Sequence, residues 1–198
     1  MRYKGIIFDL DGVICSTDEY HYQAWKALAD RLKIPFDRER NNLLRGVSRM
    51  QSLEIILEKS PLNYSEAEKI GLAEEKNTLY RQLLAQMSPK DLPDDVRSTL
   101  RALRSANLEL AIGSSSKNTP YILERIGLGS FFDAVADGNC ITHSKPHPEV
   151  FLKAADMIGL LPGECLVVED AHAGVQAAIA GGFDCAAIGD AKNDPHAD

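Results

Sequence analysis

Short apolar runs alternate with helical patterns along most of the chain. Residues 4–10 form a run with β-branched and aromatic side chains, which predicts a buried strand. Similar runs after residue 88 predict further strands at 108–113, 133–136, 165–168 and 184–188, and the segments beside them predict helices at 94–106, 119–126, 148–159 and 172–181. This alternation is typical of a doubly wound, Rossmann-like α/β core, in which helices cover both faces of a parallel sheet.

Residues 16–87 break this alternation, because their apolar positions recur at helical spacing without a convincing strand pattern. Three serines each precede Glu or Gln by three positions, which is typical of helix starts: Ser16, Ser48 and Ser65. Two prolines within residues 88–93 predict a stiff connector. We therefore expect a catalytic core of residues 1–15 and 88–198 and an inserted α-helical cap domain, 16–87, whose connectors can act as hinges.

The composition narrows the class of protein. The chain has 198 residues, of which 44% are hydrophobic and 26% charged, as in ordinary globular proteins, and no apolar run approaches the ~18 residues of a membrane span. A net charge of −7 argues against general nucleic-acid binding. The four cysteines form no CxxC pair, which predicts reduced thiols and a cytoplasmic protein. The first four residues lead straight into the first strand, so we expect no signal peptide. We expect a monomer, with a frayed polar end at 190–198.

Polar side chains stand where apolar strands end, in four separate stretches. They are Asp9 with Asp11, Ser114, Lys145, and Glu169 with Asp170. Because ligands of open α/β sheets bind outside the carboxyl ends of the strands, we expect these side chains to share one crevice. Considered alone, each stretch also has a purely structural interpretation. Asp9 and Asp11 would belong to a solvated turn, Ser114 to a hydroxyl-rich loop, Lys145 would be a solvated lysine, and Glu169 with Asp170 would cap a helix.

Two of these acids are suited to phosphoryl transfer. Asp9 and Asp11 point to the same face of an extended chain, so one carboxylate can attack phosphorus while the other moves a proton. Like charges ~4 Å apart cost about 4 kcal/mol at an effective dielectric of ~20, so a cation must offset the repulsion. Mg²⁺ fits, held by Asp9, the Asp11 carbonyl and Asp170, with Glu169 as a ligand or an outer acceptor.

The helical insertion adds candidate anion-binding groups. Arg45 and Arg49 flank a helix start, which is typical of an anion site or of a surface turn. Lys76 lies on an apolar helical stripe, where it either snorkels to solvent or reaches into the cleft between the domains. His21, also on an apolar stripe, is typical of a packing histidine. The remaining histidines show no metal-site spacing: His143, His147, His172 and His196.

The four stretches, in this order, resemble the signature motifs of the haloacid dehalogenase-like (HAD) superfamily over nearly the whole chain. An acid at Asp11 resembles the phosphatase and phosphomutase members. The insertion is similar to that of the sugar phosphomutases, on the motifs Glu19-Tyr20-His21, Gly46-Val47-Ser48-Arg49 and Lys76-Asn77. Members usually continue with another strand and a helix after the position of Ile188.

This resemblance implies a magnesium-dependent phosphomutase that interconverts β-D-glucose 1-phosphate and glucose 6-phosphate through glucose 1,6-bisphosphate. It implies that Asp9 is the phosphorylated nucleophile, Asp11 the general acid/base, and Ser114 and Lys145 the groups holding the transferred phosphoryl group. The implied distal-phosphate and sugar contacts are Arg49, Ser115, Ser116, Lys117, Asn118, Gly46, Val47, His21 and Lys76. A sugar-phosphate phosphatase on the same scaffold and a non-catalytic sugar-phosphate sensor stay open as alternatives.

Overall fold

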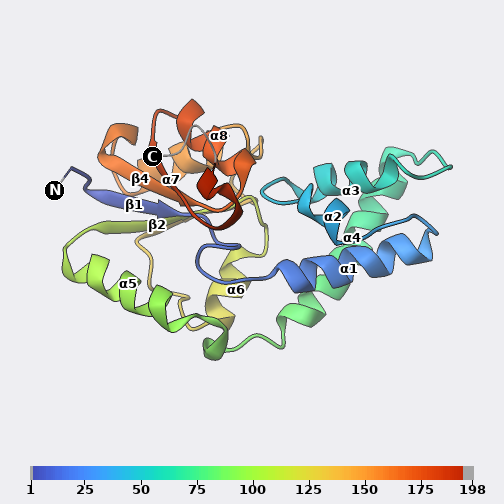
Figure 1. The fold of residues 1–198 in the computed structure, drawn as a ribbon, viewed down its shortest axis with the longest axis horizontal. Helices are drawn as coiled ribbons and strands as arrows, with labels where there is room; N and C mark the ends of the chain where they lie inside the picture. Colours follow the sequence, from blue (N-terminus) through green and yellow to red (C-terminus); the bar gives the residue numbers. More distant parts are fainter. Residues whose placement is uncertain (1, 194–198) are drawn as a thin grey trace.

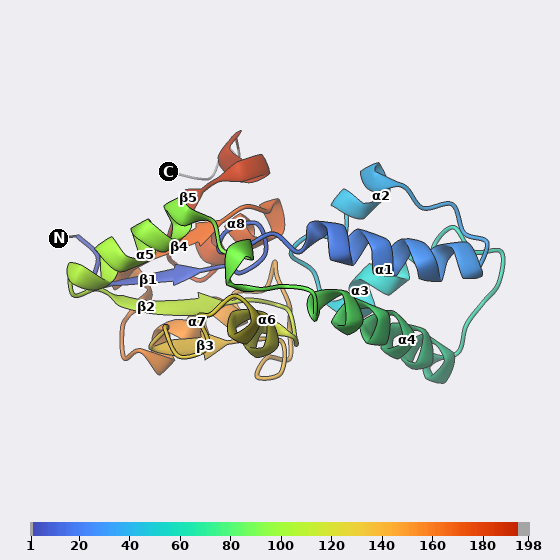
Figure 2. The same cartoon turned by 90° about the horizontal axis from the view of Figure 1, so that it is seen from below.

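Five parallel strands form the sheet of the larger lobe (Figure 1), in the order β3-β2-β1-β4-β5 (Figure 2). The computed structural model describes residues 2–193. The strands are β1 (Gly5–Phe8), β2 (Glu109–Gly113), β3 (Ala134–Ala136), β4 (Cys165–Glu169) and β5 (Asp184–Ala187). The predicted parallel α/β core is confirmed. Strand β1 is shorter than the predicted 4–10, because the chain turns at Gly12, whose φ is +85°.

Helices cover both faces of the sheet, as predicted. Successive residues of β1 face opposite sides, so Ile6 packs in one apolar cluster and Ile7 in another. The first cluster includes residues of α5 (Asp94–Ser105) and α6 (Thr119–Arg125). The second includes residues of α7 (Glu149–Met157) and α8 (His172–Ala180).

Four helices between β1 and α5 form a separate lobe (Figure 2). They are α1 (Asp18–Arg31), α2 (Arg38–Asn42), α3 (Arg49–Leu57) and α4 (Glu66–Leu84). Trp25 and Leu53 are among the buried residues of an apolar cluster within this lobe. Tyr80 and Leu84, at the end of α4, pack instead with the core cluster. These separate clusters support the division at residues 16 and 87, and the exact boundaries stay a prediction.

Two of the three predicted capping boxes are confirmed. Ser48 begins α3 and Ser65 begins α4, and each serine hydroxyl accepts the backbone N–H three residues later. The box at Ser16 is wrong, because α1 begins after Thr17 and no side chain caps it. The Thr17 hydroxyl instead donates a hydrogen bond to Asp11. The short helix α2, capped by Asp37, escaped prediction.

The connectors are short turns. The predicted stiff connector at 88–93 contains one 3-10 turn, Pro89–Asp91, and another precedes β4 at Pro162–Glu164. The expectation of a frayed end is wrong for residues 190–193, because they belong to a 3-10 turn, Gly189–Asn193, in which Ala191 is buried. Residues 194–198, with His196, lie outside the described residues. Between residues 2 and 193, no helix is both long and apolar enough to span a bilayer.

Candidate active site

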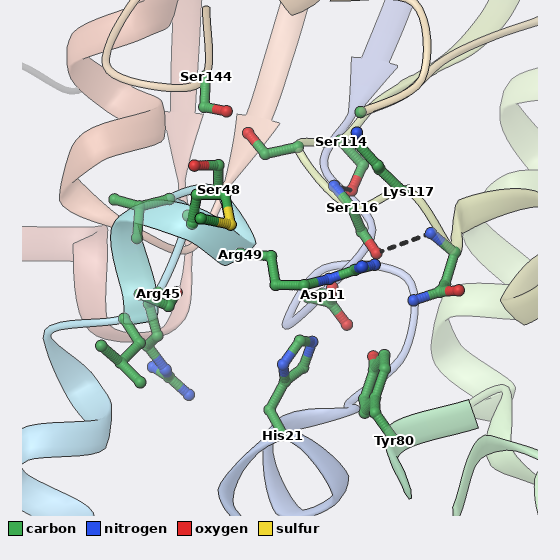
Figure 3. A pocket seen from close by; sticks show the side chains of 18 of the residues that line it. Asp11, His21, Arg45, Ser48, Arg49, Tyr80, Ser114, Ser116, Lys117 and Ser144 are labelled. Carbon is green, nitrogen blue, oxygen red and sulfur yellow. Dashed lines mark hydrogen bonds between the residues drawn. The ribbon is translucent and has the colours of Figure 1, made fainter. Parts of the chain in front are cut away.

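A cavity of about 520 Å³ lies where the carboxyl ends of the strands meet the helical lobe (Figure 3). Most of the predicted site residues line it. They are Asp9, Asp11, His21, Gly46, Val47, Arg49, Lys76, Ser114, Ser115, Ser116, Lys117, Asn118 and Asp170. Lys145 and Glu169 do not line the cavity, because both are fully buried. The structure therefore brings together residues from four separated strand ends, as the strand-end rule predicted.

Lys145 forms a buried ion-pair network with Asp9. Its ammonium nitrogen lies 2.5 Å from Asp9 Oδ1 and 2.6 Å from Glu169 Oε1. Burial lowers the pKa of Lys145, but the two carboxylates raise it by more. The pKa therefore lies above its ordinary value, and the lysine is charged at neutral pH. Burial raises the pKa of Asp9, and the charge of Lys145 opposes that rise. Lys145 therefore orients the Asp9 carboxylate and offsets its charge.

Glu169 contacts Lys145, the ion-pair partner of Asp9. Its Oε1 accepts from Lys145, and its Oε2 accepts from the Ala171 backbone N–H at 2.7 Å. Gly174 makes room for this carboxylate, since a Cβ there would lie 1.8 Å from Glu169 Oε1. Of the two roles left open for Glu169, this arrangement favours the outer acceptor, because Glu169 is fully buried and does not line the cavity.

Asp170 approaches the turn that carries the first two acids. A Cβ on Gly12 would lie 2.0 Å from Asp170 Oδ2, so only glycine allows this approach. Burial, followed by the charge of Glu169, raises the pKa of Asp170 to about 7. Asp9, Asp11 and Asp170 lie close together, and their raised pKa values mean that their negative charges are poorly compensated. Carboxylate oxygens in such a cluster suit a hard divalent cation. The residues therefore fit Mg²⁺, which Asp9, the Asp11 carbonyl and Asp170 would hold.

Asp11 is held by the Thr17 hydroxyl, which is itself held by Tyr80. Its Oδ1 accepts from the Thr17 hydroxyl, and Thr17 Oγ1 accepts from the Tyr80 hydroxyl at 3.1 Å. Burial raises the pKa of Asp11 to about 6, although the Thr17 hydrogen bond opposes the rise. A carboxyl group with such a pKa can gain or lose a proton near neutral pH, as a general acid/base requires.

The loop after β2 presents hydroxyl and amide groups to the cavity. Ser114 Oγ accepts the Ser116 N–H at 3.2 Å, and Ser116 Oγ accepts the Asn118 N–H at 3.2 Å. Ser115 Oγ is buried without a hydrogen-bond partner in the part of the chain that the structure describes. Asn118 is anchored to the helical lobe, because its Oδ1 accepts from Arg81 at 3.1 Å. These groups can bind phosphate oxygens.

The opposite wall holds a buried cation among aromatic rings. The Lys76 nitrogen lies 2.9 Å from His21 Nδ1, 4.6 Å from the Trp25 ring centre and 4.3 Å from that of Tyr80. Lys76 is only 3% exposed, so the snorkelling interpretation is wrong. Burial, with a smaller effect from Arg49, lowers the pKa of Lys76 well below its ordinary value. His21 is kept neutral, because burial and the charge of Lys76 lower its pKa.

Arg45 and Arg49 have different surroundings. Arg45 pairs with Asp18 and Asp190, and its Nη1 lies 3.9 Å from Asp170 Oδ2. Arg49 lies 3.4 Å from Glu74 at the rim and extends across the cavity toward Ser116 (Figure 3). Arg49 is therefore the better placed of the two to bind a ligand anion.

Sequence reasoning missed several residues of the cavity wall. Trp25 both packs in the cluster of the helical lobe and lines the cavity. Asp18, Asn41, Ser52, Glu74, Tyr80, Ile141 and Thr142 also line it. Helical spacing identifies buried positions, but it does not tell which of them face a cavity. Only Tyr80, four residues after Lys76, had a recognisable signal, its place on the same helical face.

The fold and this constellation of acids define a class of protein. Residues 3–182 match the haloacid dehalogenase-like hydrolases, and the chain belongs to this family.

Several relatives carry sugar-phosphate activities in their names. The chain is 40% identical over 188 residues to β-phosphoglucomutase of Bacillus subtilis, covering 94% of this chain and 83% of the relative. It is 34% identical over 186 residues to fructose-1-phosphate phosphatase of Escherichia coli, covering 92% of this chain and 95% of the relative. The crystal structure of β-phosphoglucomutase from Clostridium difficile superposes with a TM-score of 0.93 at 38% identity, covering 98% of this chain and 88% of that one.

Proposed function

We propose that this chain is a phosphomutase that interconverts β-D-glucose 1-phosphate and glucose 6-phosphate through glucose 1,6-bisphosphate. One observation carries the proposal: cationic groups stand at two separate places around a single cavity. Lys145 stands behind Asp9, while Arg49 and Lys117 line the wall elsewhere. A mutase must hold both phosphates of one sugar, whereas hydrolysis of a monophosphate needs only one such position.

Asp9 and Asp11 divide the chemistry between them. One Asp9 carboxylate oxygen attacks the phosphorus on C1 of glucose 1,6-bisphosphate, the bond from phosphorus to the sugar oxygen breaks, and Asp11 gives its proton to that oxygen, so glucose 6-phosphate leaves. When glucose 1-phosphate takes its place, Asp11 takes the proton from the free 6-hydroxyl, whose oxygen attacks the phosphorus on Asp9 and releases the carboxylate. The bisphosphate that forms then turns around for the next transfer. The pKa of about 6 at Asp11 suits both directions, and Thr17 keeps its carboxyl group in place.

Charge neutralisation is shared between this chain and a metal ion. Asp9, the Asp11 carbonyl and Asp170 would hold Mg²⁺, and the bound ion would neutralise charge on the transferring phosphoryl group. Lys145 supplies a fixed positive charge from the buried side, and Ser114 offers a hydroxyl in the cavity. Positioning and charge neutralisation are the main sources of rate in phosphoryl transfer.

The helical lobe holds the rest of the substrate and limits access of water. Arg49 reaches toward Ser116 from the opposite lobe, so a distal phosphate bound between them would link the lobes (Figure 3). Gly46, Val47, His21 and Lys76 would surround the sugar. Water that reached phosphorylated Asp9 would turn the mutase into a phosphatase, so closure of this lobe protects the intermediate. The buried positions of Cys15, Cys165 and Cys185 suit reduced thiols and so a reducing compartment, and we place the enzyme in the cytoplasm, as a monomer, within this proposal.

A sugar-phosphate phosphatase is the second candidate, favoured by the 34% identity to the E. coli enzyme. A ³¹P NMR assay with β-glucose 1-phosphate, Mg²⁺ and a trace of glucose 1,6-bisphosphate separates the two. Appearance of glucose 6-phosphate supports the mutase, and inorganic phosphate alone supports the phosphatase.

Replacement of Arg49 sharpens this assay. In a mutase, Arg49→Ala removes the distal phosphate contact, so glucose 6-phosphate formation should fall at least tenfold more than hydrolysis of p-nitrophenyl phosphate. Arg38→Ala is the matched control, because Arg38 is an exposed arginine of the same lobe that pairs with Glu19. Equal losses of both activities in Arg49→Ala would favour the phosphatase.

A further inference from the structure

Two histidines and a glutamate gather on the loop that carries Lys145. His143 and His147 are exposed, Glu149 is half-buried, and one ligand atom from each lies within 4.8 Å of the others. The two imidazole rings have centres 4.7 Å apart. The sequence spacing did not indicate a metal site, because the two histidines are separated by a loop that contains a cis Lys145-Pro146 bond rather than by a helical turn.

Local hydrogen bonds orient the three side chains. Glu149 accepts the backbone N–H groups of Thr142 at 3.0 Å and His143 at 2.8 Å, and His143 Nδ1 lies 3.2 Å from the same carboxylate. Glu149, the first residue of α7, also directs its own N–H toward His147 Nδ1 at 3.3 Å. The cluster is therefore held together by the loop itself, which lowers the entropy cost of binding a ligand.

The chemistry of this set differs from that of the site at Asp9. Imidazole nitrogens with one carboxylate suit Zn²⁺ and related first-row transition ions, whereas Mg²⁺ prefers oxygen ligands only. The set shares no residue with Asp9, Asp11 and Asp170. We infer that His143, His147 and Glu149 form a second metal site, which takes a transition ion of the Zn²⁺ class.

This second site adjoins the main cavity. A groove beside it is lined by His143 and His147 from the core and by Ser48 and Gln51 at the start of α3. Ser48, Thr142 and Ser144 line both this groove and the main cavity. An ion on the two histidines would brace the segment that carries Lys145, where the helical lobe meets the core.

NMR of histidine side chains tests the inference and does not depend on the proposed function. Long-range ¹H–¹⁵N spectra of labelled protein, kept in excess Mg²⁺ to occupy the aspartate site, report the ring nitrogens of the five histidines. With Zn²⁺ as the probe, the His143 and His147 signals should shift together and saturate near one equivalent, with a midpoint below about 50 µM. Unchanged signals, movement of only one of the two rings, or a weaker midpoint would overturn the site.

Single substitutions assign the signals and supply the controls. His143→Gln and His147→Gln should each weaken Zn²⁺ binding at least tenfold by calorimetry. His172→Gln, at the start of α8, should leave it unchanged. Equal Zn²⁺ affinity in all three variants would contradict the inference. If a variant folds poorly, the wild-type spectrum still decides, because it identifies the rings that bind the ion.

Discussion

Two buried lysines lie at the candidate site in contrasting surroundings: Lys76 lines the cavity, and Lys145 lies behind Asp9. Lys145, fully buried, contacts two carboxylates, and their charge outweighs burial and raises its pKa. Lys76, 3% exposed, contacts His21 and two aromatic rings, and burial lowers its pKa. No carboxylate within residues 2–193 pairs with Lys76 at ion-pair distance. Lys145 has its counter-charges within the protein, whereas an anionic ligand would supply the counter-charge that keeps Lys76 ionised.

This difference predicts different effects when Lys145 or Lys76 is replaced. Removing one partner of a buried ion pair leaves an uncompensated charge, which is strongly destabilising. Removing an unpaired buried cation relieves a desolvation cost instead. We therefore expect substitutions around Lys145 to damage folding and chemistry together, and substitutions around Lys76 to damage ligand binding alone.

Lys145→Met should have the largest effect. It leaves Asp9 and Glu169 buried without their cation, so the free energy of unfolding should fall by about 3–5 kcal/mol. Urea denaturation measures the loss, and Lys153→Met, at a half-exposed lysine, is the control. If Lys145→Met proved as stable as the control, the ion-pair network would not have the importance that we assign to it.

Gly174→Ala perturbs the same network without removing a charge. The added Cβ would lie 1.8 Å from Glu169 Oε1, so the carboxylate must move away from Lys145. Overpacking of this kind costs about 1–3 kcal/mol, and turnover should fall with stability. Gly163→Ala is the control, because nothing lies within 4 Å of the position of its Cβ. Similar stabilities of the two variants would show that Glu169 can relax freely.

The pH dependence of the metal-free protein tests the raised pKa of Asp170. Because the pKa of Asp170 is raised from 3.8 to about 7, the folded state binds its proton more tightly than the unfolded state. Stability without metal should therefore fall as pH rises from about 4 to about 7, by about 3 kcal/mol from this group.

Thermal melts in EDTA at pH 5 and pH 8 measure this difference. Asp170→Asn should remove much of it, and Mg²⁺ at pH 8 should restore stability to the wild type more than to the variant. A wild-type melting temperature that rises between pH 5 and pH 8 without metal would contradict the assignment of the raised pKa.

Lys76→Met should have the smallest effect on stability. Since Lys76 has no buried counter-ion, the free energy of unfolding should stay within about 1 kcal/mol of wild type or increase. The KM for the sugar phosphate should rise at least tenfold, because the anionic ligand loses its contact with this wall. A loss of stability as large as that of Lys145→Met would remove the contrast between the two lysines.

Much of the fold could be predicted from local patterns. The strands and the long helices of the core follow from apolar periodicity, and Ser48 and Ser65 begin helices because their hydroxyls satisfy free N–H groups there. Ser16 fails by the same local rule, since Thr17 is the N-cap residue and its hydroxyl is committed to Asp11, a contact made only in the folded protein.

The sequence by itself determined the sheet, the inserted helices and the four strand ends that supply Asp9, Ser114, Lys145 and Asp170, because strand polarity directs these ends to one edge. Tertiary structure decided their environment: that Lys145 is paired, that Lys76 is not, and that His143 and His147 meet Glu149. Pairing and burial depend on contacts between distant segments, and no local spacing encodes them.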